Sequence, residues 1–176
     1  MSAHLILGGA RSGKSGQAAR LAQESGWPVV FMATATLGND AEMTARIQRH
    51  QASRPSSWQV IEEPFQLAAR LYEEVAPDRF VIVDCLTLWL ANLLLAQEDS
   101  TRFHQERQAL LEIIPMLPGP VVFVSNETGL GIIPMGEINR RFADESGLLH
   151  QDVARLCDRV TLMVAGLPLT LKGTHL

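Results

Sequence analysis

The sequence contains only two cysteines, Cys85 and Cys157, among its 176 residues. They show no spacing typical of a metal site or a disulfide framework, so we expect buried thiols in a reducing compartment. The most apolar segment, 85–96, is interrupted by Thr87 and Asn92 and is too short to span a bilayer, so we expect no membrane span. The chain also has no large excess of charge of either sign, with 15 Lys and Arg against 19 Asp and Glu. A net charge of −4 gives no general attraction for nucleic acid, which we do not expect as a partner.

The remaining composition is ordinary for a globular protein. The hydrophobic fraction is 47% and the charged fraction is 19%. At roughly 150 residues per domain, the chain is long enough for one domain and short for two, so we predict a single domain over residues 1–176. The first residues are accounted for by an apolar run and a glycine-rich loop instead of a signal sequence, and we therefore expect a cytoplasmic protein.

The glycine-rich loop is the most informative feature of the sequence. It follows the apolar run 5–7 directly and matches the pattern G-x-x-x-x-G-K-S. Its residues are Gly8, Gly9, Ala10, Arg11, Ser12, Gly13, Lys14 and Ser15. A strand before such a loop and a helix after it make backbone N–H groups converge on phosphate. We therefore predict a phosphate loop, with Lys14 reaching the β- and γ-phosphates of a nucleotide and the Ser15 hydroxyl binding Mg²⁺.

Apolar strands alternate with helical segments along the chain. We predict strands at 5–7, 29–33, 58–61, 79–84, 120–125 and 159–165, the last closing the sheet, and helices at 16–25, 40–53, 66–75, 86–96, 102–116, 137–145 and 149–156. This alternation indicates an α/β fold, a mostly parallel sheet with helices on both faces. With the phosphate loop it indicates a P-loop NTPase of RecA-like architecture. Ligands of such sheets bind beyond the carboxyl ends of the strands, so the turns that follow them should surround the site.

Asp84 stands at the carboxyl end of the most apolar of these strands. In phosphate-loop proteins a carboxylate in this place holds Mg²⁺ opposite the hydroxyl of the loop, which here belongs to Ser15. The alternative is that Asp84 caps the helix that begins directly after it. The presence of a phosphate loop favours the metal interpretation.

A histidine within a basic cluster is the second distinctive feature. His50 lies late in the helix predicted at 40–53, close to Arg46, Arg49 and Arg54. Three guanidinium groups around one imidazole suit the binding of phosphate and help to keep the ring neutral. A neutral imidazole, with an ordinary pKa of about 6.5, has a lone pair that can attack phosphorus. The alternative is a partly buried surface histidine without a catalytic role, and the pattern alone does not decide between them.

Several motifs, taken in order, resemble one enzyme family. They are the phosphate loop 8–15, Arg46-Ile-x-x-His50 followed by Arg54-Pro55 and Trp58, the pair Glu62-Glu63, Asp84-Cys-Leu-Thr87, and Ser125-Asn-Glu-Thr-Gly-Leu-Gly-Ile-Ile-Pro134. Together they resemble the bifunctional adenosylcobinamide kinase and adenosylcobinamide-phosphate guanylyltransferase of cobalamin biosynthesis. The resemblance runs from about residue 5 to residue 165. The histidine segment and the Asn-Glu-Thr-Gly loop make it specific, because a phosphate loop alone occurs in many families.

The resemblance implies two reactions on one scaffold. A nucleoside triphosphate, ATP or GTP, phosphorylates the hydroxyl of the aminopropanol arm of adenosylcobinamide. His50 then attacks the α-phosphorus of a GTP, releases pyrophosphate, and passes the guanylyl group to adenosylcobinamide phosphate. The resemblance also implies a homotrimer. The residues it assigns to nucleotide contacts are Gly8 to Ser15, Thr34, Ala35, Thr36, Gln51, Ala52, Ser53, Arg54, Glu62 and Asp84.

Two further features have alternative interpretations. The Glu62 carboxylate is suited to accept hydrogen bonds from guanine N1–H and the 2-amino group, or it is simply a solvated acid beside a second glutamate. The loop 126–134 should border the site, where its polar residues would orient nucleotide or the corrinoid arm. Alternatively, it is a turn that needs Gly129 and Gly131 for its backbone geometry alone.

Other function classes are compatible with a phosphate loop. One is a kinase of another small metabolite, in which His50 is only structural. Another is a non-catalytic GTP-binding switch, or an oligomeric motor of recombinase type. A motor would need hydrolysis stimulated by nucleic acid, and the acidic net charge argues against it.

Overall fold

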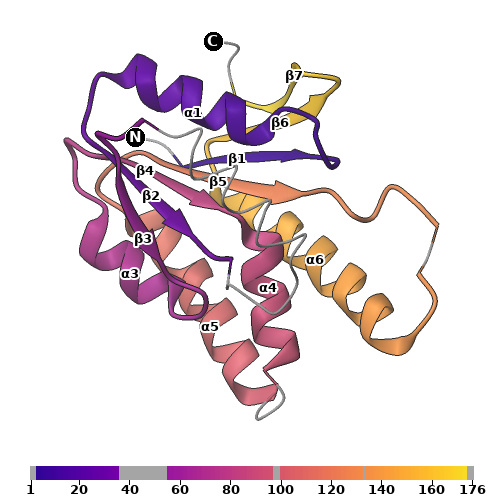
Figure 1. Cartoon of the computed structure of the whole chain (residues 1–176). Coiled ribbons are helices and arrows are strands. Elements are labelled where there is room, and N and C mark those ends of the chain that lie inside the picture. Colours follow the sequence, from indigo (N-terminus) through magenta and orange to yellow (C-terminus); the bar gives the residue numbers. More distant parts are fainter. Residues whose placement is uncertain (1–2, 36–54, 97–99, 133, 174–176) are drawn as a thin grey trace.

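The structure is a computed structural model that describes residues 3–35, 55–96, 100–132 and 134–173. Within them, seven strands form one sheet in the order β3-β2-β4-β5-β1-β6-β7 (Figure 1). The strands are β1 (Ala3–Gly8), β2 (Val29–Ala33), β3 (Gln59–Glu62), β4 (Phe80–Asp84), β5 (Val121–Asn126), β6 (Arg159–Val164) and β7 (Leu167–Lys172). Only the β6–β7 pair is antiparallel. The predicted α/β fold with a mostly parallel sheet is therefore confirmed.

Helices cover both faces of this sheet, as predicted (Figure 1). One face carries α1 (Lys14–Ser25), and the other carries α3 (Leu67–Glu74), α4 (Leu86–Leu95), α5 (Ser100–Ile113) and α6 (Glu137–Leu156). A 3-10 turn at Ile114–Met116 follows α5. The helix predicted at 40–53 lies outside the described residues. None of the helices in the described ranges is long and apolar enough to cross a membrane.

Side chains of the central strands alternate between two cores. In β1, Leu5 and Leu7 pack into the core on the α3 to α6 side, whereas Ile6 packs into the core on the α1 side. Strands β4 and β5 show the same alternation. Because successive side chains of a strand point to opposite faces and both faces are covered, these strands are apolar at nearly every position.

The predicted break between residues 145 and 149 is wrong, since α6 runs without interruption from Glu137 to Leu156. Gly147 lies inside this helix. A glycine in a helix interior costs only about 1 kcal/mol relative to alanine. Burial of Leu149 and Val153 against the sheet offsets that cost.

The strand at 159–165 does not close the sheet, because β7 adds an antiparallel edge strand beyond it. The two strands are joined by Ala165 and Gly166, with φ of 52° and 82°. Positive φ at both central residues is typical of the tight hairpin turns that match strand twist. The segment after this turn alternates leucine with other residues, which is a strand pattern that the prediction missed.

The carboxyl ends of the parallel strands meet at one edge of the sheet. Strand β5 lies between β1, which leads into the phosphate loop, and β4, which ends at Asp84. In this register Gly8 is paired with Asn126. The turns after β1, β4 and β5 are therefore neighbours, and the candidate site lies where they meet.

Candidate active site

The phosphate loop joins β1 to α1 as the sequence predicts. Gly13 forms the N-cap with φ of 100°, and α1 begins at Lys14. The first turn of α1 carries no acidic residue, so its N-terminal N–H groups keep their attraction for phosphate. Gly8 has no room for a side chain, because a Cβ there would lie 2.5 Å from the Met163 carbonyl oxygen. The structure thus gives a physical reason for both glycines of the motif.

Contacts with the β6–β7 turn support the loop. The Gly166 N–H donates a hydrogen bond of 3.0 Å to the carbonyl oxygen of Ser12. Lys14 is buried, and its Nζ donates a hydrogen bond of 2.6 Å to the carbonyl oxygen of Gly9. The ammonium group is therefore held at the loop and not at the protein surface.

Ser15 and Asp84 meet at the start of α1. Ser15 Oγ donates a hydrogen bond of 2.8 Å to Asp84 Oδ2, although the residues are 69 positions apart. The capping alternative for Asp84 is wrong, because the N-cap of α4 is Cys85, whose Sγ accepts a hydrogen bond from the N–H of Leu88. The part of the chain that the structure describes contains no group of three His, Cys, Asp or Glu arranged to hold a metal. One hydroxyl and one carboxylate fit a cation that also takes phosphate and water ligands, as Mg²⁺ does.

Both cysteines are buried and free, as predicted. Burial raises the pKa of the Cys85 thiol to about 11 and that of the Cys157 thiol to about 12. The nearby Asp84 carboxylate also raises the pKa of Cys85. Since the reactive form of cysteine is the thiolate, burial and the raised pKa values disfavour a nucleophilic role for either thiol near neutral pH.

Of the nucleotide contacts predicted after β2, the structure describes Thr34 and Ala35. Thr34 is completely buried. Its hydroxyl donates to the Cys85 carbonyl at 2.7 Å and accepts from the Cys85 N–H at 2.9 Å, so it joins the end of β2 to the start of α4. Ala35 is half-buried. The remaining predicted nucleotide contacts of this region, together with His50 and its neighbouring arginines, lie outside the described residues. They are Thr36, Arg46, Arg49, His50, Gln51, Ala52, Ser53 and Arg54.

Glu62 lies at the same edge of the sheet, at the end of β3 and in register with Ala33. It is exposed. Its neighbour Glu63 is committed to a local turn, where its Oε1 accepts hydrogen bonds from the N–H groups of Phe65 and Gln66. Between the two glutamates, Glu62 is thus the one whose position suits contact with a ligand.

The loop after β5 borders the phosphate loop, as predicted, and then extends away from the sheet (Figure 1). The Glu127 N–H donates a hydrogen bond of 2.9 Å to the carbonyl oxygen of Gly8. Neither Gly129 nor Gly131 has the positive φ that glycine alone adopts easily. Positive φ therefore explains neither glycine, although a Cβ at Gly129 would lie 3.0 Å from Glu127 Oε1.

Polar side chains from three elements meet behind this loop, a contact that the motifs containing Thr87 and Ser125 do not indicate. Ser125, at the end of β5, contacts Thr87 on α4 and His150 on α6. All three are buried. In the sequence His150 stands in a helical segment without a motif of its own, and no local pattern indicates its contact with Ser125, 25 positions earlier.

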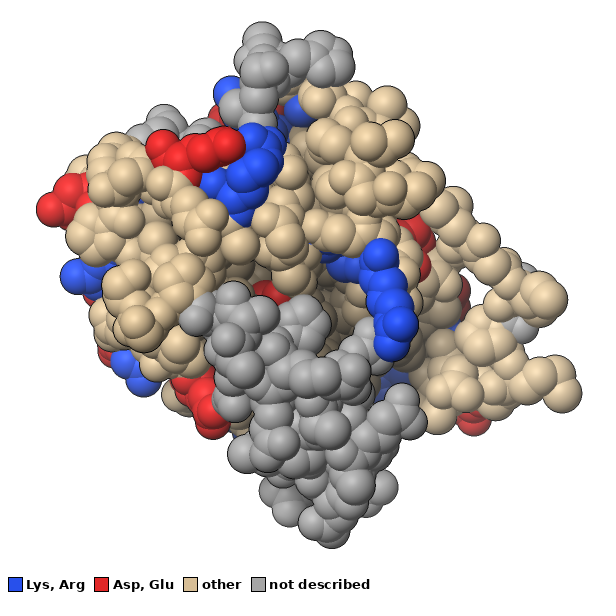
Figure 2. Space-filling model, turned by 45° about the horizontal axis from the view of Figure 1, so that its top comes forward, with Lys and Arg blue, Asp and Glu red and all other residues tan. Residues whose placement is uncertain are grey.

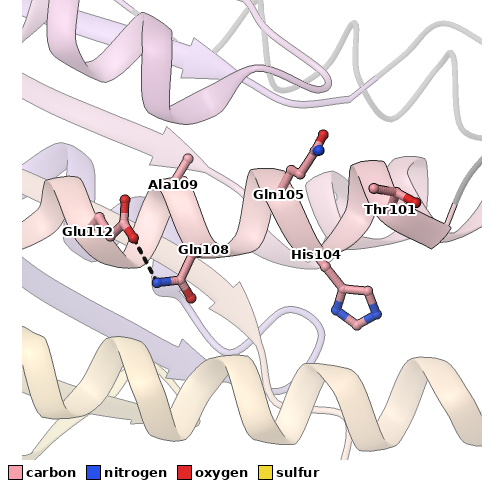
Figure 3. A pocket seen from close by; sticks show the side chains of 6 residues that line it. All are labelled: Thr101, His104, Gln105, Gln108, Ala109 and Glu112. Atoms are coloured by element: carbon pink, nitrogen blue, oxygen red, sulfur yellow. Dashed lines mark hydrogen bonds between the residues drawn. The ribbon is translucent and has the colours of Figure 1, made fainter.

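A hollow of about 560 Å³ lies elsewhere, along α5. Its lining comes from one helix and consists of Thr101, His104, Gln105, Gln108, Ala109 and Glu112. These side chains do not converge, because Gln105 and Ala109 point to one side of the helix and His104 points to the other (Figure 3). We therefore place the candidate active site at the phosphate loop and not in this hollow.

The face of the molecule drawn in Figure 2 has mixed charge. On the face drawn in Figure 2, the described Lys and Arg side chains are separated by uncharged and acidic surface instead of forming one basic patch. This arrangement agrees with the net charge of −4.

Comparison with known proteins identifies the family. The family model described as cobinamide kinase / cobinamide phosphate guanyltransferase, CobU, matches residues 4–171. The chain belongs to this family. It is 57% identical over 172 residues to the bifunctional adenosylcobalamin biosynthesis protein CobP of Pseudomonas aeruginosa, a match that covers 98% of each chain. It is 33% identical over 180 residues to the bifunctional adenosylcobalamin biosynthesis protein CobU of Escherichia coli, covering 96% of this chain and 98% of that protein.

Solved structures support the architecture of this CobU-family chain. The flagellar accessory protein FlaH from Methanocaldococcus jannaschii aligns with a TM-score of 0.54 and 14% identity, covering 98% of this chain and 79% of that one. The RadB recombinase aligns with a TM-score of 0.51 and 16% identity, covering 92% and 73%. At such low identity the likeness concerns the fold alone. It agrees with the predicted P-loop NTPase architecture of RecA type.

Proposed function

We propose that this CobU-family chain carries out both reactions named for its family. In the first, the hydroxyl of the aminopropanol arm of adenosylcobinamide attacks the γ-phosphorus of ATP or GTP, and the nucleoside diphosphate leaves. In the second, adenosylcobinamide phosphate receives GMP from GTP, and pyrophosphate is released. The family match over residues 4–171 carries this proposal.

The phosphate loop suits the first reaction. Phosphoryl transfer depends on positioning and on neutralising negative charge more than on covalent help from the protein. The N-terminus of α1 offers backbone N–H groups to the phosphates. Lys14 is held at the same place and adds a full positive charge. Both features act on the triphosphate whichever alcohol accepts the phosphoryl group.

Ser15 and Asp84 are the residues that would hold Mg²⁺. When bound, the ion neutralises charge on the β- and γ-phosphates. We expect Asp84→Asn to raise the Mg²⁺ concentration needed for half-maximal kinase activity by about tenfold or more, because a neutral amide is a weaker ligand than a carboxylate. Titration of kinase activity with Mg²⁺ measures this shift. Asp78→Asn, two residues before the strand that ends at Asp84, is the matched control, and an unchanged Mg²⁺ requirement in Asp84→Asn would refute the assignment.

The second reaction would proceed through a guanylyl group on His50. A histidine nucleophile divides one displacement into two in-line steps, with the guanylyl group held on nitrogen between them. The sequence supports this role through Arg46, Arg49 and Arg54, whose charges suit the phosphates of GTP. At the edge of the sheet, Glu62 would accept hydrogen bonds from guanine N1–H and the 2-amino group, which adenine does not offer.

The assembly also follows from the resemblance. We infer that residues 1–176 act as one domain, and that the chain works in the cytoplasm as a homo-oligomer, with a trimer as the expected state. The supporting argument is size, since one small domain hardly encloses a corrinoid. A corrinoid site formed between two subunits would enclose more of the ligand than one domain can.

The function is tested by incubating the protein with adenosylcobinamide, Mg²⁺ and nucleotide, and by identifying products by mass spectrometry. With ATP alone, the expected product is adenosylcobinamide phosphate. Addition of GTP should then yield adenosyl-GDP-cobinamide and one pyrophosphate per product. A kinase of another metabolite would leave the corrinoid unchanged, and a switch would bind GTP without turnover.

A further inference from the structure

A row of buried polar side chains lies behind the loop that follows β5. Thr87 Oγ1 is 3.0 Å from Ser125 Oγ, which is 2.7 Å from His150 Nε2. The other ring nitrogen, Nδ1, is 3.7 Å from Glu127 Oε2. The row joins α4, β5 and α6, and neither proposed reaction uses it.

In space, Ser125, His150 and Glu127 lie in the order serine, histidine, carboxylate, as in the catalytic triad of serine hydrolases. Ser125, however, has an exposed fraction of 0%, so no substrate can reach its hydroxyl. Burial also holds the pKa of His150 below its ordinary value, although the Glu127 carboxylate opposes this effect. A nucleophilic role is therefore excluded, and the ring is expected to be neutral near neutral pH.

The donors and acceptors that each group offers determine which atom donates at each contact of the row. The Asn126 N–H donates to Thr87 Oγ1 at 2.7 Å. A neutral imidazole has one N–H, and because a carboxylate only accepts, we assign this proton to His150 Nδ1, which faces Glu127. Nε2 then accepts from the Ser125 hydroxyl, and that hydroxyl accepts from Thr87. In this arrangement hydrogen bonds run from the Asn126 N–H through Thr87 and Ser125 to His150 Nε2, and Nδ1 faces the Glu127 carboxylate at 3.7 Å, beyond hydrogen-bond distance.

Both ends of the row are attached to one backbone segment, 126–129. Asn126 is bonded through its N–H to Thr87, and the Gly129 N–H donates to Glu127 Oε1 at 2.6 Å. Between them, the Glu127 N–H donates to the carbonyl oxygen of Gly8, the first residue of the phosphate loop. The row therefore adds side-chain support to a segment that the pairing of β1 with β5 places against the phosphate loop.

We propose that His150 and Glu127 are positioning residues that hold segment 126–129 against Gly8 and so keep the phosphate loop in its nucleotide-binding shape. The inference rests on nucleotide binding at residues 8–15, which is part of the proposed function, but not on the identity of the phosphate acceptor. Truncation of His150 removes the buried partner that Ser125 and Glu127 share.

The dissociation constant of GTP, measured by calorimetric titration of the full chain, tests this inference. We expect His150→Ala to raise it about tenfold, the effect of losing one buried hydrogen-bond partner. The nucleotide KM should rise by a similar factor, while kcat at saturation changes by less than about threefold, because neither residue touches the reacting atoms. His150→Asn, which can place an amide N–H near the position of Nδ1, should restore most of the affinity.

His4→Ala is the matched control. His4 has the same exposed fraction as His150, 6%, and a similar hydroxyl partner, with Nε2 2.8 Å from Thr161 Oγ1. It lies at the opposite end of β1 from the phosphate loop. His4→Ala should lower the unfolding temperature about as much as His150→Ala, with no change in GTP affinity.

Two outcomes overturn the inference: an unchanged GTP affinity in His150→Ala, or an equal loss of affinity in His4→Ala. If His150→Ala does not fold, Glu127→Ala is tested in its place. We expect the same roughly tenfold rise in the dissociation constant of GTP, because this variant removes the carboxylate that faces His150. The proposed function is judged separately, by corrinoid turnover of the unsubstituted protein. A protein that binds GTP but ignores adenosylcobinamide would refute the proposed function and still allow the positioning test.

Discussion

Replacement of Lys14 by alanine is expected to abolish both kinase and guanylyltransferase activity. In the proposed function each reaction uses a triphosphate, and we expect each to begin with that triphosphate in the loop 8–15. The Lys14 ammonium is buried at this loop, so its removal takes away a positive charge that the fold holds at the phosphate-binding backbone. Loss of one such preorganised charge costs at least about 10³-fold in rate.

Both activities are measured on the same preparation, by phosphorylation of adenosylcobinamide and by pyrophosphate release from GTP in the presence of adenosylcobinamide phosphate. Arg20→Ala is the matched control, since it also removes one cation from α1. Arg20 forms an exposed ion pair with Glu24, and such pairs contribute little. If the kinase step survives in Lys14→Ala, the assignment of the loop to the phosphoryl donor is refuted.

The sequence predicted the parts of the site that depend on short-range order. The loop 8–15 is contiguous, so its residues are already neighbours in the chain. Asp84 was also found, because the carboxyl ends of parallel strands meet at one edge and its strand is strongly apolar. The Ser15–Asp84 hydrogen bond shows that the two side chains meet across 69 positions, while their role in holding Mg²⁺ stays a prediction.

The parts that were missed depend on packing between distant segments. A helical pattern around Gly147 does not reveal whether the helix continues, because the answer depends on the apolar surface that α6 buries against the sheet. For the same reason, sequence alone does not tell whether a polar residue faces a ligand or the interior. Thr34 and Ser125 both stand at strand ends near the site, yet both are fully buried and bonded inward.

Replacement of His50 by alanine is expected to separate the two activities. If His50 carries the guanylyl group, the variant loses its nucleophile and guanylyl transfer falls by about 10⁴-fold or more. Phosphorylation of adenosylcobinamide should persist, because it needs the loop 8–15 and the Ser15–Asp84 pair but no covalent intermediate. The predicted variant is thus a kinase that accumulates adenosylcobinamide phosphate.

The measurement uses GTP labelled at the α-phosphate. The unsubstituted protein should acquire a label that is labile in acid and stable in alkali, as expected for phosphorus bound to a histidine nitrogen, and it should lose the label when adenosylcobinamide phosphate is added. His104→Ala, which removes an exposed histidine on α5, is the matched control and should label normally. Equal labelling of His50→Ala, or no label on the unsubstituted protein, would exclude the histidine intermediate. In that case the phosphate of the corrinoid would have to attack GTP directly, and the arginines around His50 would serve binding alone.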